Sequence, residues 1–247
     1  MSLLATLCAL SLLGAPTHLL RVSSAVSLSE AVRSLAARFE AQHSEVHLEL
    51  NFGASGELER QIREGAPVDL FLPAATENAD RLQARGLLVP ASRRDIARNL
   101  LVLVAPKDNV PAGEGAREKI LSPNVLRIAI GEPRTVPAGA YAMAVLMALG
   151  IDERVKDRLV QLGSVRQVLD AVARGEVDLG FVYASDLRVR PGVVEAAPLP
   201  AQIAPRIVYP AAIVASSNEK VLAEKFLALL AGPEGRAALL AAGFLAP

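Results

Sequence analysis

The chain has 247 residues, 52% hydrophobic and 21% charged, a composition typical of a folded protein with a substantial core rather than a disordered chain. Lys plus Arg and Asp plus Glu both number 26, so the formal net charge is zero and the basic surface of a nucleic-acid-binding protein is missing. The single cysteine, Cys8, excludes an intrachain disulfide and a CxxC metal or redox pair.

The first feature along the chain is an apolar run over residues 3–15 that ends in small residues. Its length suits the hydrophobic region of a signal peptide and is too short to span a bilayer. We therefore predict a signal peptide over residues 1–16, with a buried first element of the fold as the alternative.

Strand and helix patterns alternate along the rest of the chain. Period-two or wholly apolar runs predict strands over residues 19–24, 46–52, 70–73, 100–105, 126–130, 179–183 and 208–215. Helical spacing of apolar residues predicts helices over residues 28–42, 55–64, 77–85, 137–149, 165–174, 219–230 and 233–242. This alternation predicts an α/β fold with mostly parallel sheets.

Two serines lie where a predicted strand gives way to a helix. Ser27 is followed three residues later by Glu30, a capping-box pattern, so it either caps its own helix or faces a ligand. Ser55 lies among small residues, which allow backbone N–H groups to approach a ligand closely. A nucleophile elbow would need glycine at position 57, where this chain has Glu57, and no histidine is placed as a base.

Two further segments repeat this arrangement in the second half of the chain. Pro137 suits the first turn of a helix, and the N–H groups after it, including that of Ala138, are free unless this is an ordinary strand-to-helix loop. Val165 begins another predicted helix after Gly163 and Ser164. Tyr183 closes a predicted strand, where its hydroxyl either faces a cleft or lies at the edge of the core.

The four segments share one physical property. Helix N-termini carry unpaired N–H donors and the positive end of the helix dipole. Several of them directed at one point form an anion site without Lys or Arg. The spacing of such neutral donors would then select among tetrahedral oxyanions by size.

At this point the chain resembles a known family, the periplasmic molybdate-binding proteins of ABC importers. The segments that carry the resemblance, in the same order, are 25–28 (AVSL), 51–56 (NFGASG), 65–71 (GAPVDLF), 131–133 (GEP), 136–139 (VPAG) and 180–186 (GFVYASD). The match extends from about residue 19 to residue 244.

The resemblance implies a two-lobed periplasmic-binding-protein type II fold, in which each lobe is a mixed, mostly parallel sheet flanked by helices and two strands form the hinge. Lobe 1 is expected over residues 17–100 and 211–247, and lobe 2 over 101–210, with crossings near 99–104 and 209–214. The oxyanion, molybdate or its near-isostere tungstate, would lie between the lobes. The implied contacts are the hydroxyls of Ser27, Ser55 and Tyr183 and the backbone N–H groups of Ala138 and Val165.

These contacts would reach the oxygens of the anion, not the metal atom, and no cofactor is implied. The resemblance further implies a monomeric, non-enzymatic, periplasmic or otherwise extracytoplasmic protein that delivers its ligand to the membrane permease of an ABC importer. The same fold could instead bind sulfate, phosphate or ferric ion. A regulator's effector domain would carry a helix-turn-helix ahead of residue 19, and an enzyme would need a base near Ser27 or Ser55; the sequence suggests neither.

Overall fold

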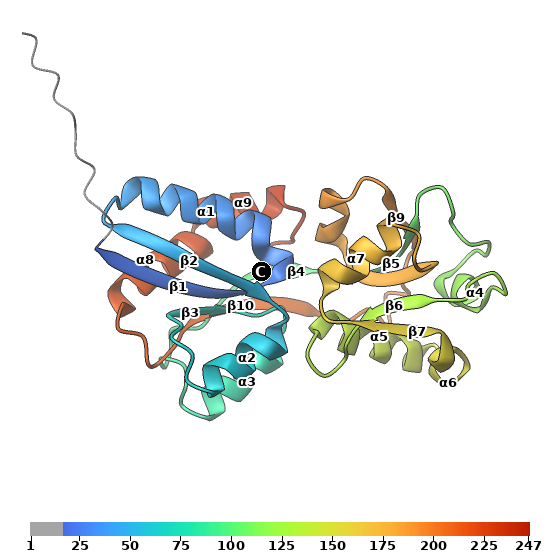
Figure 1. Cartoon of the computed structure of the whole chain (residues 1–247), viewed down its shortest axis with the longest axis horizontal. Helices are drawn as coiled ribbons and strands as arrows, with labels where there is room; N and C mark the ends of the chain where they lie inside the picture. Colours follow the sequence, from blue (N-terminus) through green and yellow to red (C-terminus); the bar gives the residue numbers. More distant parts are fainter. Residues whose placement is uncertain (1–16) are drawn as a thin grey trace, which may run out of the picture.

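The computed structural model describes residues 17–247, and the predicted signal peptide over residues 1–16 lies outside the described residues. The described chain forms two lobes that lie side by side, each built on its own five-stranded sheet (Figure 1). No helix among the described residues has both the length and the apolar character needed to cross a membrane.

The first lobe contains the sheet with strand order β2-β1-β3-β10-β4. Its strands are β1 (His18–Ala25), β2 (Val46–Gly53), β3 (Leu70–Leu72), β4 (Arg94–Asn99) and β10 (Ile207–Ile213). Its helices are the 3₁₀ turn η1 (Val26–Leu28), α1 (Ser29–Gln42), α2 (Ser55–Arg63), α3 (Thr76–Ala84), α8 (Lys220–Ala231) and α9 (Pro233–Ala241). β1 runs parallel to β2 and β3, whereas β10 runs antiparallel to β3 and β4.

The second lobe contains the sheet with strand order β7-β6-β8-β5-β9. Its strands are β5 (Leu101–Pro106), β6 (Ile128–Gly131), β7 (Leu159–Leu162), β8 (Leu179–Tyr183) and β9 (Val193–Ala197). Its helices are α4 (Ala116–Leu121), α5 (Pro137–Ala148), α6 (Asp152–Val155), α7 (Val165–Ala173) and the 3₁₀ turns η2 (Lys156–Arg158) and η3 (Ala184–Val189). β6 is parallel to β7 and β8, and β5 is antiparallel to β8 and β9.

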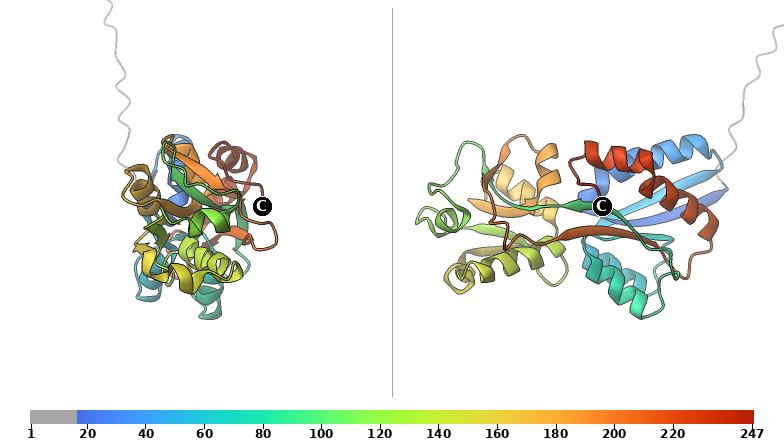
Figure 2. Two further views of the ribbon diagram at one scale, coloured as in Figure 1. Left: turned by 90° about the vertical axis from the view of Figure 1, so that its right-hand side faces the viewer. Right: turned by 180° about the vertical axis from the view of Figure 1, so that it is seen from behind.

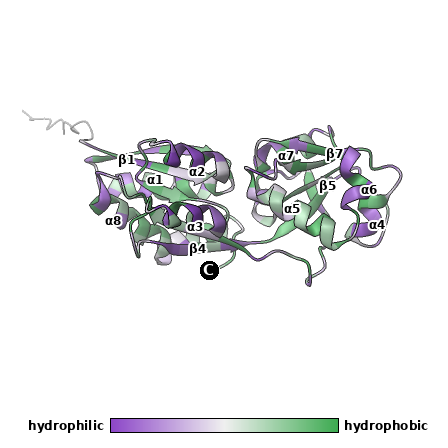
Figure 3. Ribbon diagram, turned by 90° about the horizontal axis from the view of Figure 1, so that it is seen from below, coloured by the Kyte–Doolittle hydropathy of each residue, from purple (hydrophilic) through white to green (hydrophobic). Residues whose placement is uncertain are grey.

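Each sheet is covered by amphipathic helices that bury one apolar face. In α1 the buried positions include Val32, Leu35 and Phe39, which recur at helical spacing, and full burial of one such side chain contributes about 1.5–3 kcal/mol. Figure 3 shows hydrophobic colour along the central strands and hydrophilic colour on outward faces such as those of α2 and α3. In the second lobe Gly180 permits close packing of α7 on β8, because an added Cβ would lie 2.7 Å from Val172.

The chain crosses between the lobes twice. It leaves the first sheet at Asn99, the end of β4, and enters the second at Leu101, the start of β5; it returns between Ala197 and Ile207. Both connections are visible as extended segments between the lobes in Figure 2. The sheets, their mixed strand directions and the flanking helices agree with the predicted fold class.

Candidate ligand-binding site

The predicted ligand contacts gather around one hollow between the two lobes. The hollow is lined by Ala25, Val26, Ser27, Gly53, Ala54, Ser55, Ala74, Val136, Pro137, Val165 and Tyr183. Ser27, Ser55, Val165 and Tyr183 are therefore brought together, and Ala138 directly follows the lining residue Pro137. The first lobe supplies the segments that follow β1, β2 and β3, and the second supplies the starts of α5 and α7 and the end of β8.

Ser27 does not cap a helix, which excludes the first of the two alternatives that its sequence pattern left open. The 3₁₀ turn η1 intervenes, α1 begins at Ser29, and neither start has a side-chain cap. Ser29 Oγ, rather than Ser27, donates to the carboxylate of Glu30, at 3.0 Å. The hydroxyl of Ser27 instead lies 3.1 Å from that of Tyr209, and the side chain is buried at the wall of the hollow.

Ser55 is the first residue of α2 and only 1% exposed. Its Oγ accepts a hydrogen bond from the backbone N–H of Ala74, at 2.9 Å. Because that N–H fills one lone pair of the oxygen, the hydroxyl proton of Ser55 is free to donate to another group. The loop after β3 thus orients the side chain as a donor at the wall of the hollow.

Tyr183 brings a buried hydroxyl that has no hydrogen-bond partner among residues 17–247. Its ring is 1% exposed, and burial raises the pKa of the phenol well above its ordinary value, so the hydroxyl keeps its proton. A buried polar group without a partner costs about 1–3 kcal/mol. Since Tyr183 lines the hollow, a ligand oxygen that accepts a hydrogen bond from this hydroxyl would remove that cost.

The second lobe also presents two helix N-termini. α7 starts at Val165, directly after Ser164, whose Oγ accepts from the N–H of Gln167 at 3.2 Å. α5 starts at Pro137, so the N–H of Ala138 belongs to its first turn. N–H groups in a first turn have no acceptor within their own helix, and the helix dipole makes these ends favourable for an anion.

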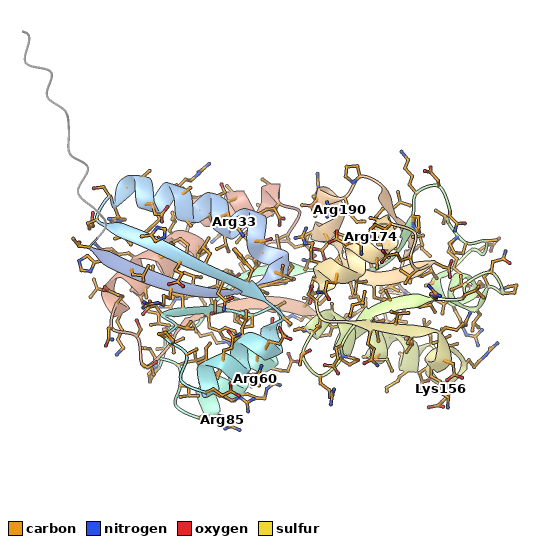
Figure 4. All side chains as sticks on the ribbon, in the orientation of Figure 1. Arg33, Arg60, Arg85, Lys156, Arg174 and Arg190 are labelled. Atoms are coloured by element: carbon orange, nitrogen blue, oxygen red, sulfur yellow. The ribbon has the colours of Figure 1, made fainter. Side chains whose placement is uncertain are left out.

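No charged side chain lines the hollow among the described residues. The six cations labelled in Figure 4 are all exposed on the two lobes. A buried carboxyl, that of Asp186, lies three residues after the lining residue Tyr183, and its Oδ2 accepts from the N–H of Tyr183 at 3.0 Å. Burial raises the pKa of Asp186 to about 6, and Arg166, at 3.7 Å from Oδ1, opposes that rise.

Two polar contacts join the lobes beside the hollow. The guanidinium of Arg166 in α7 lies 3.0 Å from the carboxylate of Glu30 in α1. The N–H of Gly56 in α2 donates to the carbonyl of Thr135 in the second lobe, at 2.8 Å. Gly56 permits this approach, because an added Cβ would lie 2.8 Å from the Thr135 backbone.

Comparison with known proteins identifies the family. The family model described as "Bacterial extracellular solute-binding protein" matches residues 20–245. The chain belongs to this family. The chain therefore has the fold of an extracellular solute-binding protein. Proteins of this family bind solutes rather than catalyse reactions, which agrees with the predicted lack of enzymatic activity.

Three relatives show how far this likeness extends. The putative ABC transporter substrate-binding lipoprotein YvgL of Bacillus subtilis (strain 168) is 33% identical over 92% of this chain and 86% of its own length. The molybdate-binding protein ModA of Escherichia coli (strain K12) is 34% identical over 86% of this chain and 83% of its own. The structure of the Azotobacter vinelandii periplasmic molybdate-binding protein is 29% identical, with a TM-score of 0.82, and the match covers 92% of this chain and 99% of that one.

Sequence reasoning did not single out two side chains of this solute-binding protein that lie just behind the hollow. Tyr209 and Asn99 are buried, and both are hydrogen-bonded toward Ser27, Tyr209 directly and Asn99 through Tyr209. The available signal was weak: a tyrosine inside the otherwise apolar strand β10 and an asparagine at the end of β4.

Proposed function

We propose that this solute-binding protein captures molybdate or tungstate in the hollow between its lobes and delivers the anion to the permease of an ABC importer. The observation that carries the proposal is the hydroxyl of Tyr183, buried without a partner at a hollow bounded by neutral donors. The names of relatives at 30–34% identity support the choice of ligand.

The donor pattern favours an anion that carries no proton of its own. Among residues 17–247, the hydroxyl protons of Ser55 and Tyr183 have no acceptor, and Ala138 and Val165 add first-turn N–H groups. Within the described part of the chain, no carboxylate lines the hollow, so a ligand that carries a proton would find no carboxylate acceptor there. Molybdate, tungstate and sulfate are fully deprotonated at neutral pH, whereas phosphate retains a proton that would need an acceptor.

Neutral donors also suit a ligand that must be released again. A buried ion pair would demand large desolvation on both partners and would leave an unpaired buried charge after release. Hydroxyl and N–H groups can hold the oxygens of a dehydrated dianion, and after release they require only water. This property fits a protein that carries its ligand to a permease outside the cytoplasm. We propose that it acts as a monomer in the periplasm or its extracytoplasmic equivalent.

The test is a calorimetric titration of the full chain with sodium molybdate, tungstate, sulfate and phosphate in turn. We expect one molybdate or tungstate per chain and no heat of binding from sulfate or phosphate. Sulfate binding of comparable strength would favour the alternative, a sulfate-binding protein of the same fold. A chain that binds none of the four would refute the proposal.

A pair of serine variants links binding to the hollow. Ser55→Ala is expected to weaken molybdate binding by about 1.5–3 kcal/mol, because a hydrogen bond to a charged oxygen is lost. Ser24→Ala is the matched control: Ser24 is also fully buried, but its Oγ donates to the carbonyl of Ala25 and does not line the hollow. Equal losses in the two variants would mean that the hollow is not the binding site.

A further inference from the structure

Tyr209 lies one layer behind the hollow and contacts Ser27. The tyrosine belongs to β10, is fully buried, and does not line the hollow. Its hydroxyl oxygen lies 3.1 Å from Ser27 Oγ and 3.4 Å from Asn99 Nδ2. The ring is held edge-on against Tyr183 and Phe244, with centroids 5.8 and 5.2 Å away. The position of this hydroxyl is therefore fixed by packing as well as by hydrogen bonds.

The orientation of the Asn99 amide determines which of its atoms faces Tyr209. Asn99 Oδ1 accepts from the backbone N–H of Leu100, at 2.9 Å, so the oxygen end of the amide is assigned. The Nδ2 end then faces Ser185 Oγ, at 2.9 Å, and the Tyr209 hydroxyl. An amide nitrogen only donates, so the oxygen of Tyr209 is an acceptor toward Asn99.

The proton of Tyr209 consequently has one acceptor. Burial raises the pKa of Tyr209 far above its ordinary value, so the phenol stays protonated. Among residues 17–247, Ser27 Oγ is the only acceptor within hydrogen-bond distance of this hydroxyl. If Ser27 donated to Tyr209 instead, the phenolic proton would be buried without a partner, which is the more costly arrangement.

We propose that Tyr209, supported by Asn99, is a positioning residue that orients the hydroxyl of Ser27 as a donor into the hollow. Because Tyr209 donates to Ser27 Oγ, the proton of Ser27 is free for an oxygen of the bound anion. This inference rests on the proposed oxyanion-binding function and adds two residues to it. The order of donation is Asn99 to Tyr209, Tyr209 to Ser27, and Ser27 to the ligand.

The location of these side chains extends the inference to the hinge. Asn99 is the last residue of β4 at the first crossing and pairs with Ile207 at the start of β10. Its contact with Ser185 reaches the second lobe, two residues after Tyr183. The orientation of the Ser27 hydroxyl in the first lobe therefore depends on side chains at the crossing and in the second lobe.

A double-mutant cycle on sodium molybdate affinity tests the inference, using the wild type, Tyr209→Phe, Ser27→Ala and the double variant. Tyr209→Phe removes one oxygen and keeps the ring, and we expect about 2- to 12-fold weaker binding, the usual worth of one neutral hydrogen bond. In the Ser27→Ala background the same change should leave affinity unaltered. Tyr141→Phe is the control, because Tyr141 is half-buried and does not line the hollow.

The outcomes separate this inference from the function on which it rests. A wild type that binds no molybdate contradicts the proposed function itself. A wild type that binds, combined with an equal effect of Tyr209→Phe in both backgrounds, overturns the positioning role alone, because packing losses do not depend on Ser27.

Neutron diffraction from deuterium-exchanged crystals of the molybdate-bound wild type needs no variant. The deuteron of Tyr209 is expected on the line to Ser27 Oγ. A Ser27 deuteron pointing at Tyr209 would contradict the proposed order of donation.

Discussion

The hydroxyl of Tyr183 offers a test in which binding and stability should respond differently. Replacement by phenylalanine removes one oxygen that has no hydrogen-bond partner within the described chain. Tyr183→Phe therefore breaks no hydrogen bond within residues 17–247, and the ring keeps its place beside Tyr209. The variant therefore removes a proposed ligand contact without removing a structural one.

The expected changes in binding and in stability both follow from the unpartnered hydroxyl of Tyr183. Loss of a hydrogen bond to a charged oxygen costs about 1.5–3 kcal/mol, which corresponds to molybdate binding weaker by about 10- to 150-fold. The free energy of unfolding without ligand should stay within about 0.5 kcal/mol of the wild type or rise, because an unpaired polar atom leaves the interior. For most buried tyrosines, whose hydroxyls are hydrogen-bonded, the same substitution would lower stability.

Molybdate titration calorimetry measures the first quantity, and urea unfolding of the ligand-free protein measures the second. Tyr141→Phe serves as the matched control, since Tyr141 lies in a neighbouring cleft and not at the hollow. Unchanged affinity would show that the Tyr183 hydroxyl does not contact the anion. A marked loss of stability would show that this hydroxyl has a partner within the protein, and either result refutes the reasoning.

Two further predictions concern the charges beside the hollow. Glu30→Gln removes the ion pair with Arg166 between the lobes, so molybdate affinity should fall by about 2- to 5-fold at low salt and by less at high salt, as is usual for a partly exposed pair. Asp186→Asn concerns pH: burial raises the pKa of Asp186 from 3.8 to about 6, so its contribution to stability is fully present below about pH 4 and lost as the pH rises through about 6. Asparagine does not titrate. The stability difference between the two proteins, measured by urea unfolding at pH 4 and at pH 7, should therefore shift toward the variant by about 2 kcal/mol at the higher pH.

For each of these two predictions, one experimental outcome would contradict it. Glu234→Gln is the control for Glu30→Gln, because Glu234 pairs with Arg38 inside the first lobe, at 3.8 Å. Equal effects of the two variants on affinity would show that a pair between the lobes has no special role in binding. A difference in stability between wild type and Asp186→Asn that does not change with pH would show that the carboxyl of Asp186 titrates alike in the folded and unfolded chain.

The central elements of both sheets were predictable because burial on both faces makes their sequences apolar. β5 and β8 have buried central positions and were predicted within one or two residues. The strands that the sequence did not predict, β4, β7 and β9, are edge strands of their sheets. Edge strands have one partner and greater exposure, as the polar sequence of β4 shows, so their hydrophobic pattern is weak.

The site was predictable to the extent that it depends on local sequence. Ser55, Ala138 and Val165 lie at helix starts, which the strand-to-helix pattern marks, and the hollow is lined by or adjoins all three. The role of Ser27 was ambiguous, because one additional 3₁₀ turn decides whether its hydroxyl caps a helix. The partnership of Ser27 with Tyr209 spans 182 positions and depends on where β10 returns to the first sheet, which local patterns do not encode.

Polar contacts between the lobes bear on how an anion held between them would stabilise the joined arrangement. Gly56 to Thr135 is one backbone hydrogen bond, and Glu30 to Arg166 is a partly exposed ion pair. These two contacts contribute about 0.5–1.5 and 0–1 kcal/mol. An anion held by Ser27 and donors of the other lobe would add several hydrogen bonds that exist only when the lobes meet. If the lobes close on the anion, these hydrogen bonds would stabilise the closed arrangement, and weakening the interlobe contacts should lower affinity modestly without altering which anion is chosen.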